Sequence, residues 1–210
     1  MNRPGELWIV AGPNGAGKTT LVQQGPLREL LPNAAFLNPD DHTLAELRRK
    51  GYTGFADAPV EILNHTFRHS ADFTFAELEQ RLAEGDIVCV ETVLSTEKYR
   101  PIVERVLQAG GTFFLIYVSL RSPALACERI QWRVQQGGHD VPAEKVHRRW
   151  QRSLGQLGWF ATRATRFWVF DNSDSVSGHP PVLLAEGVGG ECTLHRHDFP
   201  DVAAALKSGL

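Results

Sequence analysis

Short apolar runs alternate along the chain with longer segments in which apolar residues recur at helical spacing. Apolar runs bounded by Gly, Pro, Asn or Asp predict strands, and the segments between them predict helices. The first five runs are apolar almost throughout, which is typical of parallel strands covered on both faces. The predicted strands are Leu7–Ala11, Ala34–Asn38, Ile87–Glu91, Thr112–Leu120, Phe167–Asp171 and Val182–Glu186.

Helical periodicity fills the intervals between these strands. One candidate, residues 58–84, is long enough that a break near Ser70 is an alternative. The alternation of strands and helices over 210 residues predicts one α/β domain, residues 1–210, with helices on both faces of a mainly parallel sheet of five to six strands. The predicted helices are Gly17–Gln24, Asp41–Lys50, Ala58–Glu84, Glu97–Ala109, Ser122–Gln136, Pro142–Leu157 and Asp198–Lys207.

The segment between the first strand and the first helix is rich in glycine. Residues 12–19 read GPNGAGKT, a complete match to the Walker A pattern GxxxxGK(S/T). Such glycines let backbone N–H groups turn toward one anion, while Lys18 supplies charge to the β- and γ-phosphates and the Thr19 hydroxyl can bind Mg²⁺. A turn that binds nothing is the alternative, but the flanking strand and helix favour a phosphate-binding loop. The predicted ATP-binding residues of this loop are Gly12, Pro13, Asn14, Gly15, Ala16, Gly17, Lys18, Thr19 and Thr20.

Acidic residues follow two of the predicted strands. Asp40 and Asp41 come just after the second strand, and Glu91 ends the third, before Thr92. Because ligands of an open parallel sheet bind at the carboxyl ends of the strands, Asp40 is predicted to lie near the phosphates and to act as a general base. The alternative is that Asp40 or Asp41 only caps the next helix. Glu91 resembles the acid of a Walker B strand, so it is predicted to hold Mg²⁺ through water or, with Thr92, to bind the substrate; an ordinary polar strand end is the alternative.

Basic residues are concentrated in the second half of the chain. Residues 129–166 contain eight Lys or Arg and two acidic residues, although the whole chain has a net charge of −2. Two helices joined by a Gly-Gly turn carry the arginines at a spacing of four residues, which predicts a lid over residues 129–157 whose guanidinium groups bind phosphate oxygens. A solvated basic face or a nucleic-acid patch is the alternative. The predicted lid residues are Arg129 and Arg133 as catalytic groups, and His139 and Arg148 as substrate contacts.

Two further segments are candidates for binding. Residues 51–84 are predicted either to form a helical insertion that binds the substrate or to be an ordinary covering helix. Asn172 lies in the polar turn after the fifth strand, which predicts a contact with the nucleotide base; a simple Asx turn is the alternative.

The overall composition narrows the class of protein. A net charge of −2 does not favour general binding to nucleic acid or membranes. The three cysteines, Cys89, Cys127 and Cys192, are isolated and lack metal-ligand spacing, as expected in a reducing compartment. With no long apolar segment near the first residue, the expected location is the cytoplasm.

Seven short blocks occur in a characteristic order: GPNGAGKTT (12–20), FLNPDD (36–41), ETVLS (91–95), SPALA (122–126), GGHDVP (137–142), RRWQRSL (148–154) and DNS (171–173). Together they resemble the zeta toxin family, in particular its short single-domain members, over most of residues 7–173. The resemblance implies a P-loop kinase-like fold with a helical lid, similar to adenylate and shikimate kinases, and an ATP- and Mg²⁺-dependent phosphotransferase.

The resemblance also implies an acceptor and a partner. The best-known family members phosphorylate a hydroxyl of UDP-N-acetylglucosamine and are blocked by a small antitoxin protein, so a sugar nucleotide and an antitoxin are expected here. By position, Lys18 and Thr19 match the Walker A residues, Asp40 the catalytic aspartate, Glu91 a substrate contact and Arg129 a γ-phosphate contact.

The chain departs from the family pattern in the lid and in the acceptor region. A second γ-phosphate arginine of the toxins aligns near His139, so Arg133 or Arg148 is expected to replace it. The sugar-nucleotide contacts are not recognisable in residues 51–84. Two other functions compete with a small-molecule kinase: an ATP-hydrolysing switch, and a kinase of nucleic-acid ends that uses the basic lid.

Overall fold

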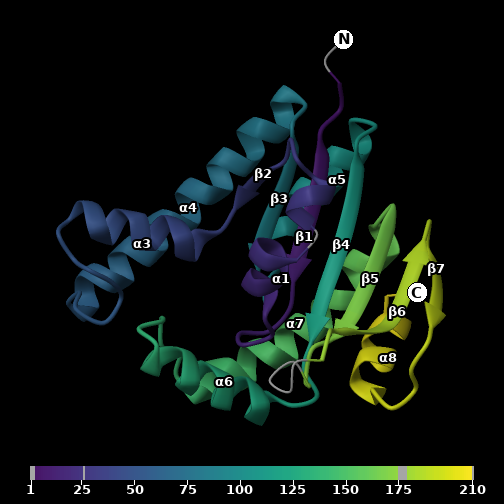
Figure 1. Ribbon diagram of the computed structural model, residues 1–210. Helices are drawn as coiled ribbons and strands as arrows, with labels where there is room; N and C mark the ends of the chain where they lie inside the picture. Colours follow the sequence, from purple (N-terminus) through teal and green to yellow (C-terminus); the bar gives the residue numbers. More distant parts are fainter. Residues whose placement is uncertain (1–2, 26, 175–178, 210) are drawn as a thin grey trace.

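A computed structural model describes residues 3–25, 27–174 and 179–209. Its strands are β1 (Glu6–Ala11), β2 (Ala35–Leu37), β3 (Ile87–Thr92), β4 (Thr112–Ser119), β5 (Arg166–Asp171), β6 (Val182–Val188) and β7 (Glu191–Leu194). They form one sheet in the order β2-β3-β1-β4-β5-β6-β7 (Figure 1). The first five strands pair in parallel, whereas β6 and β7 are antiparallel additions at the edge.

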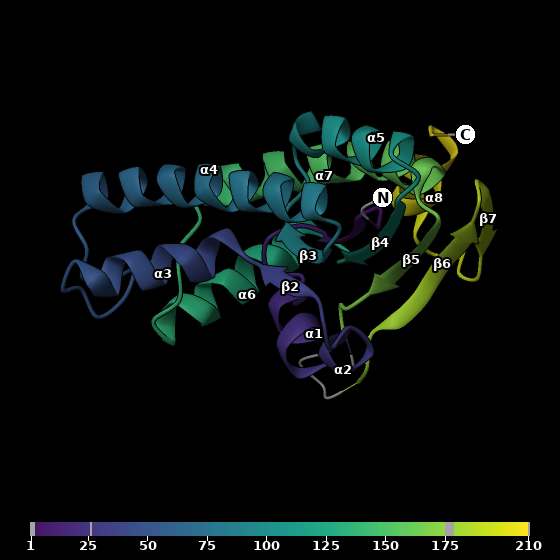
Figure 2. The ribbon, with the colours of Figure 1, turned by 90° about the horizontal axis from the view of Figure 1, so that it is seen from above.

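Helices cover both faces of this sheet. They are α1 (Lys18–Gln24), α2 (Leu27–Leu30), α3 (Pro39–Arg49), α4 (Val60–Glu84), α5 (Arg100–Gln108), α6 (Pro123–Gln135), α7 (Ala143–Arg163) and α8 (Pro200–Lys207), with a 3-10 turn at Glu97–Tyr99. Figure 2 shows α4, α5, α7 and α8 on one side of the strands and α1, α2 and α6 on the other. The α/β fold with a mainly parallel sheet and flanking helices is therefore confirmed.

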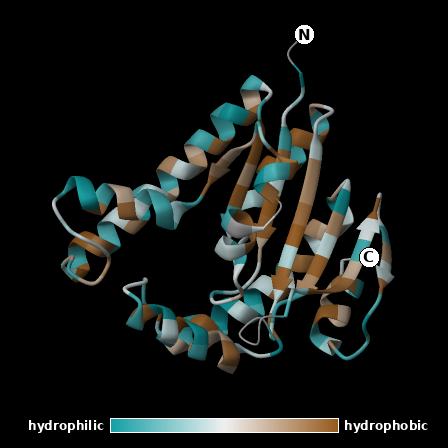
Figure 3. Cartoon of the chain, in the orientation of Figure 1, coloured by the Kyte–Doolittle hydropathy of each residue, from teal (hydrophilic) through white to brown (hydrophobic). Residues whose placement is uncertain are grey.

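Alternate residues of the strands point to two separate cores. In β1, Leu7 and Ile9 are fully buried against the side covered by α4, α5, α7 and α8, whereas Val10 is fully buried on the α1 side. Figure 3 shows hydrophobic residues concentrated in these strands. Because both sides of a parallel strand are buried, its sequence is a near-continuous apolar run.

The structure has elements that the periodicity did not predict. Strand β7 makes the sheet seven strands wide, one more than expected, and it joins β6 through Gly189 and Gly190, which have φ values of 59° and 91°. Two consecutive residues with positive φ suit a tight hairpin, and glycine adopts them without strain. Helix α2 was also missed, and α7 continues six residues beyond the predicted end, to Arg163.

Helix α4 is continuous, so the alternative of a break near Ser70 is wrong. Ser70 is fully buried, and its hydroxyl lies 2.9 Å from Nδ1 of His42 on α3. The second half of α4 places Leu78 and Leu82 in the core, while its first half lies beside α3, away from the strands (Figures 1 and 2). We call α3, residues 50–59 and the first half of α4 the arm.

Three aromatic rings stack on the α1 side of the sheet. The Trp8 ring lies 4.3 Å from that of Phe114 and 6.1 Å from that of Trp168, with interplanar angles of 18° and 7°. They come from β1, β4 and β5. Within the described ranges, no helix has the length and apolar character needed to cross a membrane.

Candidate active site

The glycine-rich loop connects β1 to α1, as predicted. Gly12, Gly15 and Gly17 have φ values of 142°, 76° and 86°, which other residues rarely adopt. A Cβ atom on Gly12 would lie 2.0 Å from the carbonyl oxygen of Val118 on β4, so a side chain has no space there. The strand–loop–helix arrangement of a phosphate-binding loop is thus present.

Lys18 lies inside this loop. Its Nζ donates a hydrogen bond of 2.9 Å to the carbonyl oxygen of Pro13, and the side chain is 7% exposed. Burial lowers the pKa of the Lys18 ammonium below its ordinary value, while the carboxylates of Glu91 and Asp40 act in the opposite direction. Two of the predicted acidic residues therefore lie close enough to act on the lysine of the loop.

Glu91 connects the phosphate loop to the neighbouring strand β2. One of its carboxylate oxygens accepts a hydrogen bond of 2.8 Å from the Thr19 hydroxyl, and the other accepts one of 3.0 Å from Nδ2 of Asn38. Burial raises the pKa of Glu91, against the effect of Lys18 and of the Thr19 hydrogen bond. A hydroxyl and a carboxylate suit Mg²⁺, which keeps several waters and uses few protein ligands. In the described part of the chain, no cluster of three His, Cys, Asp or Glu offers a different metal site.

Asp40 projects from the first turn of α3 and is exposed. The cap of α3 is Asn38, whose side chain accepts a hydrogen bond of 2.9 Å from the Asp40 backbone N–H, so the alternative that Asp40 or Asp41 caps this helix is wrong. Burial lowers the pKa of Lys18, His139 and Arg149, and the Asp40 carboxylate opposes this shift in each of them. Asp40 thus lies between the phosphate loop and the predicted lid.

The predicted lid, residues 129–157, falls on the second half of α6, the turn after it and most of α7. Arg129 donates a hydrogen bond of 2.7 Å to the carbonyl oxygen of Ser173, after β5, and Arg133 donates one of 2.5 Å to that of His139. The Nε atoms of both arginines are buried and have no hydrogen-bond partner among the described residues. These two guanidinium groups are therefore held in place and retain an unused donor.

The ion pair of Arg148 is with a residue of its own helix rather than with a predicted site residue. The Arg148 side chain is 56% exposed and lies 4.0 Å from the carboxylate of Glu144, one turn earlier on α7. The next residue, Arg149, is half-buried, and its pKa is lowered by burial and raised by Asp40. Arg149 is therefore the one of these two arginines that faces Asp40. The sequence assigned the contact to Arg148, because a spacing of four residues does not distinguish two adjacent arginines, although they differ by about 100° around the helix.

Removal of the Arg149 guanidinium is expected to lower ATP turnover much more than removal of that of Arg148. Arg149→Ala should reduce kcat/KM by about 10²–10³-fold, since a fixed cation beside the reacting groups loses its stabilisation of developing charge. Arg148→Ala, the matched control, should change kcat/KM by less than about 3-fold, as expected for an exposed ion pair. Equal losses in the two variants would contradict the assignment.

His139 joins the lid turn to the arm. Its ring centroid lies 4.4 Å from that of Phe67 on α4 and 5.6 Å from that of Phe55 in the arm. Burial lowers the pKa of His139; Asp40 and Asp140 oppose this shift, and Arg133 and Lys145 reinforce it. The neutral His139 ring therefore packs against two aromatic side chains of the arm, and the lid turn contacts the arm at this point.

Acidification is expected to loosen this contact. Since the pKa of folded His139 lies below the ordinary value of 6.5, the contact is complete above pH 6.5 and weakens as the pH falls from there toward the folded pKa. Hydrogen exchange of residues 137–142, corrected for its intrinsic pH dependence, should rise between about pH 7.5 and about pH 5.5. His139→Phe keeps a ring that cannot titrate and should show no such rise; the same rise in both proteins would exclude His139 as its cause.

Asn172 and Thr92 form hydrogen bonds with backbone groups of neighbouring segments. Nδ2 of Asn172 donates a hydrogen bond of 2.8 Å to the carbonyl oxygen of Ala16 in the phosphate loop, while Oδ1 is buried without a partner among the described residues. The Thr92 hydroxyl accepts a hydrogen bond of 3.1 Å from the Leu94 backbone N–H. Thr20 is exposed on α1.

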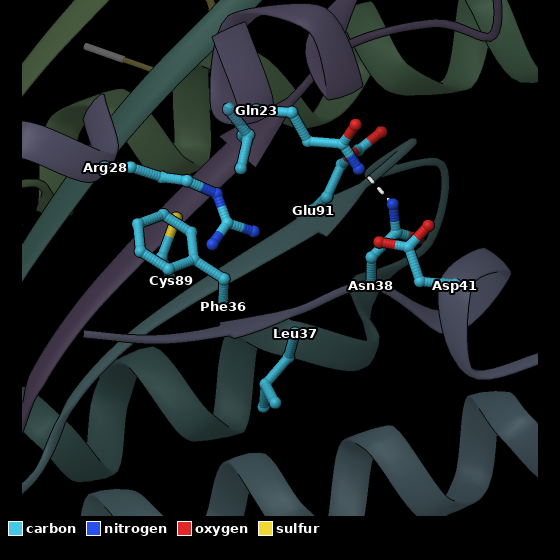
Figure 4. Close-up of a pocket in the computed structure, with 9 residues that line it drawn as sticks. Gln23, Arg28, Phe36, Leu37, Asn38, Asp41, Cys89 and Glu91 are labelled. Carbon is cyan, nitrogen blue, oxygen red and sulfur yellow. Dashed lines mark hydrogen bonds between the residues drawn. The ribbon is translucent and has the colours of Figure 1, made fainter. Parts of the chain in front are cut away.

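A small pocket on the α1 side of β2 and β3 adjoins Glu91. Figure 4 shows its lining, which includes Gln23 and Asp41. The Arg28 guanidinium lies 4.5 Å from the centre of the Phe36 ring, and Arg28 opposes the effect of burial, which raises the pKa of Asp41. The two adjacent aspartates therefore have different neighbours: Asp41 is next to α2, and Asp40 is next to the lid.

A Walker A loop between β1 and α1, with an acid at the end of β3, defines a P-loop nucleotide-binding domain of the α/β class. The chain belongs to the AAA domain family, whose model matches residues 7–157. This match covers the phosphate loop, Asp40, Glu91 and the whole of the predicted lid, residues 129–157. No curated protein sequence matches the chain.

Several solved structures share the fold. A complex of AvrRxo1-ORF1 with ORF2 and ATP has a TM-score of 0.67 at 14% identity, over 98% of this chain. The PezAT toxin–antitoxin system of Streptococcus pneumoniae has a TM-score of 0.54 at 16% identity, over 80% of this chain and 69% of that one. A Pnkp1/Rnl/Hen1 RNA repair complex has a TM-score of 0.51 at 15% identity, over 73% of this chain and 45% of that one. The chain spans 61–63% of the length of the AvrRxo1-ORF1 structures, and at these identities the likeness shows the fold alone.

Proposed function

We propose that this chain is an ATP- and Mg²⁺-dependent kinase that transfers the γ-phosphate to a hydroxyl group of a small molecule. The observation that carries the proposal is the position of Asp40, an exposed carboxylate close to Lys18 of the phosphate loop and to Arg149 of α7. In a kinase such a carboxylate accepts the proton of the acceptor hydroxyl, whereas in a hydrolytic switch the group at this place orients the attacking water.

The phosphates of ATP fit the cationic side of the site. The loop from Gly12 to Thr19 would bind them through backbone N–H groups, and Lys18 would exchange its contact with the Pro13 carbonyl for a phosphate oxygen. Arg129, Arg133 and Arg149 would stabilise charge that develops on the γ-phosphate. Mg²⁺, held by Thr19 and through water by Glu91, would neutralise phosphate charge.

The acceptor fits the side bounded by the arm and the lid. Asp40 would accept the proton of its hydroxyl, and Glu91, Thr92 and His139 are the candidate contacts that orient it. Neutral His139 can also exclude water from the γ-phosphate, because its ring packs against the arm. Residues 51–84 would supply the outer wall of the acceptor site.

A sugar nucleotide such as UDP-N-acetylglucosamine is the proposed acceptor, with an antitoxin protein as a possible partner. The acceptor rests on the resemblance to the zeta toxin family alone, and the antitoxin rests on that resemblance and on the fold shared with the toxin–antitoxin system PezAT. Asn172 supports nucleotide binding indirectly in this proposal, by holding the Ala16 carbonyl of the phosphate loop.

The test is an incubation of the protein with ATP, Mg²⁺ and a panel of acceptors, followed by mass spectrometry. The panel contains UDP-sugars, other sugar nucleotides, simple sugars and oligonucleotides with 5′-hydroxyl ends. A mass gain of one phosphate on a sugar nucleotide supports the full proposal. A gain only on oligonucleotides would replace the acceptor, and ATP hydrolysis with no gain on any acceptor would favour the switch.

A further inference from the structure

A chain of buried hydroxyl groups links the core to the segment that follows Glu91. Tyr117 on β4 and Ser153 on α7 are both fully buried, in a core that is otherwise apolar. Oγ of Ser153 lies 2.9 Å from the Tyr117 hydroxyl and donates a hydrogen bond of 2.6 Å to the carbonyl oxygen of Val93. Three separate parts of the fold therefore meet at one serine.

The direction of the hydrogen bonds follows from the available protons. The Val93 carbonyl can only accept, so it takes the single hydroxyl proton of Ser153. The Tyr117 hydroxyl must then be the donor to Ser153. Burial raises the pKa of Tyr117, which keeps the phenol protonated and able to donate. Tyr117 thus donates to Ser153, and Ser153 donates to the Val93 carbonyl.

The carbonyl that Ser153 holds belongs to a strained turn. Leu94 has a φ of 56°, and it is the one non-glycine residue with positive φ among the described residues. Leu94 is also buried, and such a conformation for a branched side chain persists only when its surroundings enforce it. The Thr92 hydroxyl and Ser153 bind the two polar groups of the peptide bond that joins Val93 to Leu94: Thr92 accepts from the Leu94 N–H, and Ser153 donates to the Val93 carbonyl. This segment follows β3 directly, so it continues from the strand end that carries Glu91 and Thr92.

Ser153 also sits one helical turn after Arg149, the arginine that faces Asp40. Residues four apart share a face of a helix. A bond that fixes Ser153 to β4 and to the Val93 carbonyl therefore fixes the height and rotation of the turn that carries Arg149. Neither of these hydrogen bonds of Ser153 goes to the phosphate loop or to Asp40.

We propose that Ser153, supported by Tyr117, is a positioning residue that holds the turn after Glu91 and the Arg149 turn of α7 as one unit around Asp40. Its kinetic consequence rests on the proposed kinase function, whereas its structural consequence does not. Ser153→Ala leaves the Val93 carbonyl and the Tyr117 hydroxyl unpaired, so it should be more severe than Tyr117→Phe, which removes only the outer bond.

The structural part of the test is a measurement of hydrogen exchange in residues 92–96. Exchange should accelerate about 10-fold in Ser153→Ala and less in Tyr117→Phe, since one lost buried hydrogen bond corresponds to about that factor. The control is Thr162→Val on the same helix, whose hydroxyl bonds only to carbonyls of α7 itself. Unchanged exchange in Ser153→Ala, or equal acceleration in Thr162→Val, would overturn the proposal.

The kinetic part of the test is a double-mutant cycle between Ser153 and Arg149. Ser153→Ala should lower kcat by about 10–10²-fold with the KM for ATP nearly unchanged, as expected when catalytic groups are misplaced. In an Arg149→Ala background the same change should cost less than about 3-fold. Independent effects would exclude action through Arg149. If the wild-type protein phosphorylates no acceptor, the proposed function fails, and the exchange experiment still decides the positioning role. If Ser153→Ala does not fold, Tyr117→Phe is used in both experiments.

Discussion

Replacing Asp40 with alanine is expected to lower kcat for phosphorylation of the acceptor by about 10²–10⁴-fold, the usual contribution of a general base. Binding of ATP should change by less than about 3-fold, because the proposed phosphate-binding groups are on the loop, α6 and α7 rather than on α3. Asp40 is exposed, and the cap of α3 is Asn38, so the variant should fold normally. The measurement is steady-state kinetics with an acceptor identified by mass gain, together with equilibrium binding of ATP.

Asp41→Ala is the matched control for this prediction. Asp41 is the next residue on the same helix, but it lies beside Arg28 and the pocket of Figure 4 rather than beside Lys18. Its replacement should reduce kcat by less than about 5-fold, since no reacting group is removed. Asp40→Ala with the wild-type rate would show that Asp40 is not the base, and a larger loss in Asp41→Ala would move that role to its neighbour.

Replacing Lys18 with alanine is expected to damage both binding and turnover. The ammonium is the buried cation of the phosphate loop, and its loss should lower kcat/KM by about 10³-fold through weaker phosphate binding and weaker stabilisation of developing charge. The free energy of unfolding should change by less than about 1 kcal/mol, because the lost bond to the Pro13 carbonyl is offset by relief of a buried charge. Kinetics and urea denaturation measure the two effects separately.

Lys145→Ala is the control for Lys18→Ala. Lys145 is an exposed cation near Arg149, where its main effect on neighbours is electrostatic. Its removal should lower kcat/KM by less than about 5-fold, and that loss should shrink at high salt. A similar loss in both variants, or a Lys18→Ala protein that binds ATP as tightly as the wild type, would contradict the role given to the loop lysine.

The sequence predicted the fold through features that depend on local chemistry. Strands buried on both sides must be apolar throughout, so β1, β3 and β4 were visible as runs. Strand β7 was missed because it is a four-residue edge strand with exposed residues, and burial imposes no pattern on it. The Gly189-Gly190 pair after β6 was the available signal, since two adjacent glycines favour a tight hairpin.

The candidate site was predictable where a motif fixes the backbone and less so where only side-chain direction matters. The phosphate loop, Asp40 and Glu91 follow from strand ends, and the structure brings all three together. The choice between Arg148 and Arg149 depends on the rotation of α7, which tertiary contacts such as that of Ser153 set. Periodicity carries no information on those contacts.

The ring stack of Trp8, Phe114 and Trp168 has a consequence for the circular dichroism of the protein. Trp8 and Trp168 are far apart in the chain, yet their indoles are nearly parallel and 6.1 Å apart only when β1, β4 and β5 have assembled. Indoles at this separation couple their electronic transitions, so the circular dichroism of the folded sheet should change when Trp8→Phe removes one of the pair. Because Trp8 lies on the strand that leads into the phosphate loop, that signal is an intrinsic spectroscopic reporter of whether each active-site variant retains its central sheet.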